Sequence, residues 1–254
     1  MKITNVRKNQ NAQNQNARGV CVLLLAIFAL GCAACGHSSF NRTQQNEHGM
    51  SEPKRNASPI VYVALGDSTG AGVGAREGGY VARIFTRLRH EHGGSRLINL
   101  CVSGATTADL VRGQLDLAIT VRPTLLTLGI GINDVTRGVS VEEFAQNYET
   151  IVARLKNETN VPLVVTNIPD IALAPAVPVF ARDELRRRIN LFNERIDETS
   201  RRHGALVVDT YNATRDVIGD HTEFFSSDGF HPSDAGYEYW AKTMWPTVKS
   251  AVGE

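Results

Sequence analysis

Residues 60–68 read IVYVALGDS. An unbroken apolar run that ends at a glycine is typical of a strand buried on both faces of a parallel sheet. Ligands of such sheets bind beyond the carboxyl ends of the strands, so Ser68 is predicted to stand at the ligand-binding edge, on the turn after the first strand. Serine at such a turn is also a frequent helix cap. Ser68 by itself therefore leaves a structural and a catalytic role open.

The rest of the chain alternates apolar segments with amphipathic ones. Further strands are predicted at Leu97–Leu100, Thr124–Leu128, Leu163–Thr166 and Ala205–Val208. The last two are almost unbroken apolar runs, as burial on both faces of a sheet requires. Helical stripes such as the one that contains Ile84 and Leu88 lie between the strands. This alternation predicts an α/β fold, a three-layer α/β/α sandwich around a five-stranded parallel sheet.

Polar residues and glycines follow the ends of the other strands as well. Gly104 comes after the second strand and Asn133 after the third, and Asp228 and His231 follow the last strand in the segment DGFHP. The carboxyl ends of parallel strands meet at one edge of the sheet. We therefore expect these residues to converge with Ser68.

The residue types match the parts that ester hydrolysis through a serine needs. Ser68 is the candidate nucleophile, and His231 is the candidate base, because histidine is the side chain best suited to proton transfer near neutral pH. Asp228 is expected to orient His231 by accepting a hydrogen bond from its Nδ1. The candidate oxyanion donors are the backbone N–H groups of Ser68 and Gly104 and the side-chain amide of Asn133. Gly104 suits this role because a residue without Cβ lets its N–H approach a substrate closely.

Several of these residues also have a structural alternative. Asn133 and Asp134 form a pair that is common in turns. His231 could belong to a surface loop in front of the last helix, for which Ser233 is a suitable N-cap. We expect the acids Asp67 and Asp134 to hold loops by hydrogen bonds rather than to take part in the chemistry.

Four motifs resemble, in their order, those of the SGNH (GDSL-type) serine hydrolase family of esterases and lipases: Ser68 in Gly-Asp-Ser, Gly104, Asn133 in Gly-x-Asn-Asp, and Asp228 and His231 in Asp-x-x-His. The resemblance extends from Ile60 to Val252. It implies a flavodoxin-like fold, the same roles for the matching residues, and cleavage of carboxylic esters through an acyl-enzyme on Ser68, with no cofactor. The common α/β-hydrolase fold is disfavoured, because it requires Gly-x-Ser-x-Gly and places its acid and histidine far apart in the sequence.

The substrate stays open among lipid esters, acylated or acetylated sugars and thioesters. The apolar, proline-rich stretch Ile168–Val179 can wall an acyl pocket or merely cover the edge of the sheet. Two other functions remain: an O-acyltransferase of the cell envelope that uses the same triad, and a non-catalytic binding lipoprotein. The complete set of candidate residues counts against the second.

The N-terminal part has the pattern of an export signal. Residues 1–35 begin with basic residues and no acid, and an apolar run that ends at Leu30 follows. This run is shorter than the roughly 20 residues of a spanning helix. Cys32 resembles the lipidation site of bacterial lipoproteins, with Cys35 as a second candidate. We expect an exported lipoprotein anchored to a membrane of the cell envelope, with a secreted or periplasmic protein as the alternative.

Composition bears on the domain organisation and on the partners, disulfides and metals to expect. A polar linker is predicted at residues 36–58 and one catalytic domain at 59–254. The formal net charge of +1 gives no reason to expect a nucleic-acid partner. Cys101 is the one cysteine in the domain, so no disulfide framework is expected. His90 and His92 have no third ligand at a suitable spacing, so we expect a solvated helix end and no metal.

Overall fold

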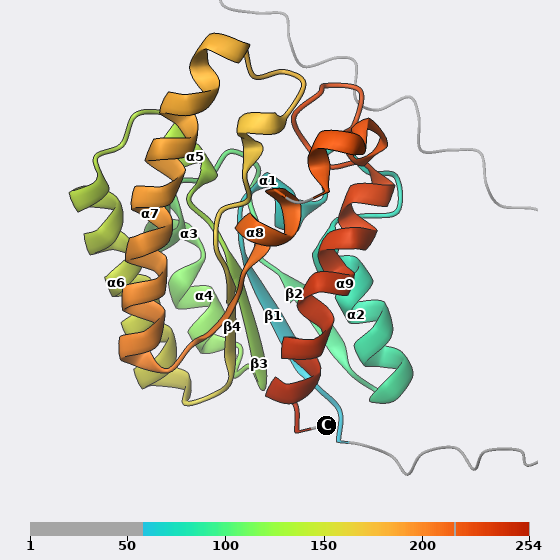
Figure 1. Ribbon diagram of the computed structural model, residues 1–254. Helices are drawn as coiled ribbons and strands as arrows, with labels where there is room; N and C mark the ends of the chain where they lie inside the picture. Colours follow the sequence, from blue (N-terminus) through green and yellow to red (C-terminus); the bar gives the residue numbers. More distant parts are fainter. Residues whose placement is uncertain (1–57, 216, 254) are drawn as a thin grey trace, which may run out of the picture. The chain divides into compact units, whose positions relative to one another are not determined.

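The computed structural model describes residues 58–215 and 217–253 (Figure 1). The predicted signal segment with Cys32 and Cys35, and the predicted linker up to residue 57, lie outside these residues. Within the described part of the chain, no helix combines the length and the apolar character that crossing a membrane requires.

Parallel strands form one five-stranded sheet. The strands are β1 (Val61–Gly66), β2 (Arg96–Asn99), β3 (Leu125–Gly129), β4 (Leu163–Thr166) and β5 (Leu206–Val208). Their order in the sheet is β2-β1-β3-β4-β5. The strand order reverses between β1 and β3, and this is the point at which open α/β sheets bind ligands. Gly66 pairs with Gly129 there, so β1 and β3 end level with each other.

Helices connect the strands and cover both faces of the sheet. They are α1 (Ser68–Ala71), α2 (Tyr80–Glu91), α3 (Thr107–Gly113), α4 (Leu115–Thr120), α5 (Ile132–Thr136), α6 (Val141–Thr159), α7 (Arg182–His203), α8 (Thr210–Arg215) and α9 (Asp234–Ala251). Short 3-10 turns are η1 (Ile171–Leu173), η2 (Val179–Ala181), η3 (Ile218–Asp220) and η4 (Thr222–Phe224).

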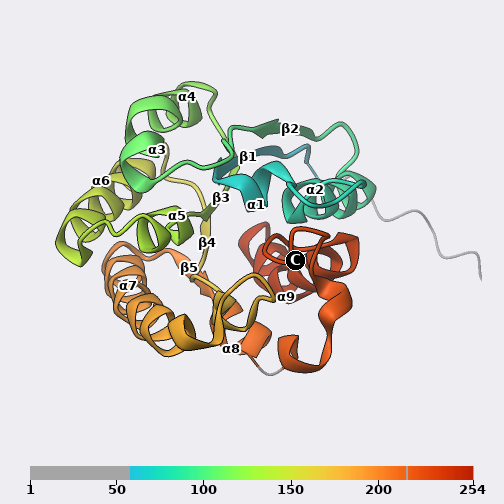
Figure 2. The same ribbon diagram turned by 90° about the horizontal axis from the view of Figure 1, so that it is seen from above.

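The side chains of β1 alternate between two hydrophobic cores. Tyr62 and Ala64 pack with α2 and α9 on one face, and Val63 and Leu65 pack with the helices of the other face. Seen from above, α2 and α9 lie together on one side of the sheet, and α3, α4, α6 and α7 lie on the other (Figure 2). The predicted three-layer sandwich is thereby confirmed.

The edge strands differ from the sequence expectation. The fifth strand is predicted to be buried on both faces, but Leu206 is 39% exposed. The reason is topological, because β5 pairs with β4 alone. β2 is the opposite edge and is likewise only half-buried. The central strands β3 and β4 are buried throughout.

Candidate active site

Ser68 begins α1 directly after β1, and it is almost fully buried. Asp67 is the N-cap of this short helix. Its Oδ1 accepts hydrogen bonds from the backbone N–H and the hydroxyl of Thr69, each at 2.9 Å. Asp67 therefore holds the turn that presents Ser68, as its expected loop-holding role requires.

Gln114 fixes the backbone just before this turn. Its Nε2 donates to the carbonyl oxygen of Gly66 at 2.8 Å, and its Oε1 accepts from the N–H of Gly66 at 2.9 Å. A Cβ at position 66 would collide with the carbonyl oxygen of Gly129, so this position requires glycine. Two hydrogen bonds from one planar amide set both the place and the direction in which the chain leaves the sheet toward Ser68.

His231 joins Ser68 to Asp228. Its Nε2 lies 3.0 Å from Oγ of Ser68, and its Nδ1 lies 2.6 Å from Oδ2 of Asp228. When Nδ1–H donates to Asp228, Nε2 is the ring atom that can accept the hydroxyl proton of Ser68. The structure thus brings these three predicted residues into one chain of hydrogen bonds.

The other carboxylate oxygen of Asp228 accepts hydrogen bonds from its own loop. The donors are the hydroxyl of Ser226 at 2.8 Å, the N–H of Phe230 at 2.8 Å and the N–H of His231 at 2.9 Å. Partial burial opposes ionisation, but the hydrogen bonds, above all the one from the His231 side chain, hold the pKa of the Asp228 carboxyl well below its ordinary value. Asp228 is therefore anionic wherever His231 can act as a base.

Asp67 is a second acid near Ser68 and His231, and its pKa is shifted in the opposite direction to that of Asp228. Burial raises the pKa of Asp67 to about 6, although the hydrogen bonds from Thr69 and the nearby His231 favour the ionised form. The carboxyl of Asp67, in the turn before Ser68, therefore becomes charged close to the pH range in which an unperturbed imidazole titrates.

Gly104 stands in the turn after β2, and Asn133 stands in the first turn of helix α5, which follows β3; β2 and β3 are the two neighbours of β1. Gly104 has φ +80°, which favours glycine. The amide Nδ2 of Asn133 donates one hydrogen to the carbonyl oxygen of Ala105 at 2.9 Å, which joins the two turns and leaves its second hydrogen for another acceptor. Buried Asp134 secures the same junction by accepting from the N–H of Thr107 at 3.0 Å and from its hydroxyl at 2.5 Å. The roles of Gly104 and Asn133 as oxyanion donors remain predictions.

A narrow pocket of about 70 Å³ lies beside Ser68 and His231. Its walls come mostly from apolar side chains of the strand ends, the loop after β4, the segment around η4 and helix α9. They include Ile130, Ile168, Ile171, Phe224, Phe225 and Trp240. An apolar space next to a nucleophile suits the acyl group of an ester better than a charged group.

The sequence model of the GDSL-like Lipase/Acylhydrolase family matches residues 64–239, which is more than half of the chain. The chain belongs to this family. Among curated proteins, it is 25% identical to esterase TesA of Pseudomonas aeruginosa over 198 residues, which cover 76% of this chain and 90% of the relative. It is 28% identical to the acetylxylan esterase of Geobacillus stearothermophilus over 181 residues, which cover 67% of this chain and 81% of the relative.

Solved structures of the GDSL type share the fold. A variant of an acetyl xylan esterase from Geobacillus stearothermophilus superposes with a TM-score of 0.64 at 23% identity, over 76% of this chain and 96% of that chain. The lipase/acylhydrolase from Enterococcus faecalis superposes with a TM-score of 0.61 at 24% identity, over 75% of this chain and 96% of that chain. The predicted family and fold are thus confirmed, and this GDSL protein is a serine ester hydrolase.

The apolar stretch Ile168–Val179 divides into two parts. Ile168, Pro169 and Ile171 line the pocket of the GDSL enzyme, whereas Val179 at the other end is 77% exposed. The stretch is anchored near its start, where fully buried Asp170 accepts from Nε of Arg186 on α7 at 2.9 Å. The first part of the stretch therefore lines the pocket, and its far end is exposed on the surface.

The burial of His92 differs from the sequence prediction. The pair His90 and His92 is expected in solvent, but His92 is only 4% exposed. It is the C-cap of α2, and its Nδ1 lies 3.1 Å from the carbonyl oxygen of Ser58, because the chain that enters β1 runs past this helix end. Among the residues described, no group of three or more His, Cys, Asp or Glu side chains is placed to hold a metal ion.

Gln114 and Ser226 support the site without standing in a motif. Gln114 is 48 residues from the Gly66 that it holds, and no local pattern indicates such a partner. Ser226 does carry a signal, because a hydroxyl two residues from an acid is a common loop-holding arrangement.

Proposed function

We propose that this GDSL-family enzyme hydrolyses short acyl esters of sugar hydroxyls through an acyl-enzyme on Ser68. The observation that carries the proposal is the hydrogen-bonded chain from Asp228 through His231 to Ser68, beside a small apolar pocket. The base is within hydrogen-bond reach of both the nucleophile and the orienting acid.

Acylation begins when Nε2 of His231 takes the hydroxyl proton of Ser68 while Oγ bonds to the ester carbonyl carbon. The carbonyl oxygen becomes an oxyanion, for which the N–H groups of Ser68 and Gly104 and the amide of Asn133 are the candidate donors. His231 then gives its proton to the leaving oxygen. The carbon–oxygen bond breaks, the alcohol departs, and the acyl group stays on Ser68.

Deacylation repeats these steps with water as the nucleophile. His231 takes a proton from the water, the resulting hydroxide attacks the acyl carbon, and the proton returns to Oγ of Ser68 as the acid leaves. Asp228 stays ionised in both half-reactions and stabilises the imidazolium that forms in each of them.

The size of the pocket supports a short acyl group. Its volume of about 70 Å³ is far below the roughly 300 Å³ at which pockets for drug-sized ligands begin. The sugar alcohol is supported by the likeness to an acetylxylan esterase at 28% identity. Together these observations favour acetylated glycans over long-chain lipid esters.

We expect the enzyme to release acetate from acetylated xylan and to prefer p-nitrophenyl esters with two to four acyl carbons. A methylene that enters apolar space is worth roughly 0.8 kcal/mol, about fourfold in kcat/KM. This gain should end where the pocket is full. The measurement is kcat/KM over a series of acyl chain lengths, with acetate release from the glycan in parallel. Acyl transfer to added polysaccharide that exceeds hydrolysis would instead indicate an O-acyltransferase.

Phe225→Ala tests the pocket directly, because it removes a wall and should move the preferred acyl chain to greater length. Phe180→Ala is the matched control, since Phe180 is 90% exposed and does not line the pocket. A parent enzyme whose kcat/KM keeps rising to long acyl chains would contradict the assignment of this pocket to short acyl groups.

For its location, we propose export and lipid attachment at Cys32, supported by the basic start and the short apolar run of residues 1–35. The full-length chain is expected in the membrane fraction of a bacterial host. One acyl chain gives only marginal binding, so firm retention requires the several chains of a lipoprotein. Intact-mass analysis should show added lipid that Cys32→Ala abolishes and Cys35→Ala retains. The opposite pattern would move the site to Cys35, and no lipid in any form would reject the anchor.

A further inference from the structure

The loop between α1 and α2 lies against the segment that carries His231. Gly74, with φ +94°, is at the closest approach: a Cβ there would lie 2.7 Å from the carbonyl oxygen of Pro232 and 2.9 Å from Cβ of His231. One turn into α9, the hydroxyl of Tyr237 donates to the carbonyl oxygen of Val73 at 2.8 Å. The segment that follows Ser68 and the segment that carries His231 are therefore in contact at two further places besides the hydrogen bond between Ser68 and His231.

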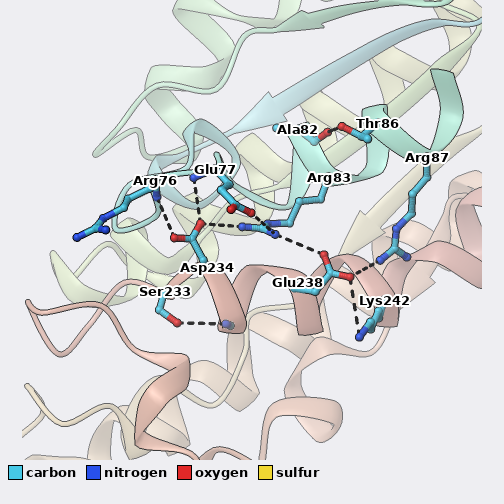
Figure 3. A network of polar contacts seen from close by, with 11 residues as sticks. Arg76, Glu77, Ala82, Arg83, Thr86, Arg87, Ser233, Asp234, Glu238 and Lys242 are labelled. Carbon is cyan, nitrogen blue, oxygen red and sulfur yellow. Dashed lines mark hydrogen bonds and ion pairs between the residues drawn. The ribbon is translucent and has the colours of Figure 1, made fainter. Parts of the chain in front are cut away.

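Asp234, the first residue of α9, connects these two sides through its carboxylate (Figure 3). Its Oδ2 accepts from the N–H of Arg76 at 3.2 Å, and its Oδ1 accepts from the N–H of Glu77 at 3.0 Å. Oδ1 also accepts from the guanidinium of Arg83 on α2 at 2.8 Å. The hydrogen bonds from the backbone of Glu77 and Arg76 hold the pKa of the Asp234 carboxyl below its ordinary value. Its charge therefore persists at neutral pH.

Glu238, one turn further along α9, makes a second set of ion pairs with α2 (Figure 3). It accepts from Arg87 at 2.7 Å and from Arg83 at 3.4 Å. These pairs join one helix to another. The hydrogen bonds of Asp234 differ, because two of them reach the backbone of the loop that follows the nucleophile helix.

We propose that Asp234 is a positioning residue for the pair of Ser68 and His231. Asp234 lies three residues after His231, so its carboxylate fixes the end of the histidine loop to the loop that follows Ser68. This role rests on the proposed function, in which His231 takes the proton of Ser68. The transfer needs a heavy-atom distance of about 2.6 to 3.2 Å. Two segments 163 residues apart keep that distance only while they are fixed to each other.

Asp234→Asn tests this role, because it removes the charge and replaces one of two oxygens, each of which accepts from a backbone N–H, with an amide nitrogen that cannot accept. We expect kcat for p-nitrophenyl acetate to fall about tenfold, as a small misplacement of a catalytic group does, with KM changed by less than about twofold. Labelling of Ser68 by a fluorophosphonate should slow by the same factor. Because kcat is expressed per titrated active site, loss of folded protein does not enter the result.

Glu238→Gln is the matched control on the same helix, since it removes ion pairs with Arg83 and Arg87 and leaves the loop hydrogen bonds in place. It should keep kcat within about twofold of the parent. Asp234→Glu covers the case in which the amide variant does not fold, because an acid in the first turn stabilises a helix. Its carboxylate is displaced by one methylene, so kcat should fall by roughly threefold at unchanged KM.

Parent-level kcat in each Asp234 variant that folds would overturn this role, and so would an equal loss in Glu238→Gln. A lower unfolding midpoint with normal kcat per site would reduce Asp234 to a stabilising contact. A parent enzyme that neither turns over esters nor reacts with the fluorophosphonate would instead reject the proposed function, so the two failures are distinguishable.

Discussion

Ser68→Ala is expected to abolish the reaction of this enzyme with fluorophosphonates and to lower turnover of p-nitrophenyl acetate on the order of 10⁴-fold or more. Without Oγ no acyl-enzyme forms, and the remaining donors can only stabilise attack by water. His231→Ala should lose a similar amount, because nucleophile and base act as a unit. Steady-state kinetics measures the loss, and intact-mass analysis after labelling shows whether Ser68 carries the adduct.

Two control variants separate these losses from damage to the fold. Ser140 caps α6 by accepting from the N–H of Glu143, so Ser140→Ala should cost about 1 kcal/mol of stability and leave turnover normal. His90 is exposed in the last turn of α2 and does not line the pocket, so His90→Ala should be as active as the parent. Parent-level turnover in Ser68→Ala would refute the acyl-enzyme.

Asn133→Ala should lower kcat by about 10²- to 10³-fold, on the order of 3 to 4 kcal/mol, which is the loss seen when one oxyanion donor is removed. KM should change little, because the donor is aimed at charge that develops only in the transition state. Asn133→Asp should be at least as damaging, since it places a negative charge beside the oxyanion. Labelling of Ser68 should slow in these variants without disappearing.

The hydrogen bond from Asn133 to Ala105 makes a stability measurement necessary on the same preparation. A residue that only ties the two turns would lower the thermal midpoint and leave kcat within roughly threefold of the parent, far short of the loss for a missing donor. Asn147→Ala is the control for the loss of an amide near this junction, because Asn147 donates to the hydroxyl of Thr107 at 3.4 Å. That variant should be nearly fully active.

The fold could be predicted from its strands because their apolar runs are long enough to stand out. All five strands lie within about one residue of their predicted bounds, a margin at which assignment itself varies. The exposure of Leu206 could not be predicted from its run, because an edge strand and a central strand can have the same apolar sequence. Strand order decides between them, and strand order is a property of the whole sheet.

The candidate site likewise contains residues that could be predicted from the sequence and residues that could not. Ser68 and His231 stand in local motifs whose chemistry limits the possible partners, so their contact could be expected from the sequence. The residues that hold them could not, because Gln114 and Asp234 bind backbone groups far away in the chain, and any polar side chain could make such a bond. The burial of His92 depends in the same way on a distant segment, the chain that enters β1.

The order of segments along the chain separates the nucleophile from its base in time as well as in sequence. Synthesis delivers N-terminal segments first, so the turn that carries Ser68 exists long before the loop that carries His231. The same late helix, α9, covers the face of the sheet on which Tyr62 and Leu125 are buried. In the proposed mechanism, closure of that hydrophobic core and assembly of the pair of Ser68 and His231 are therefore expected to occur together. A chain in which α9 has not yet packed is expected to carry Ser68 without its base.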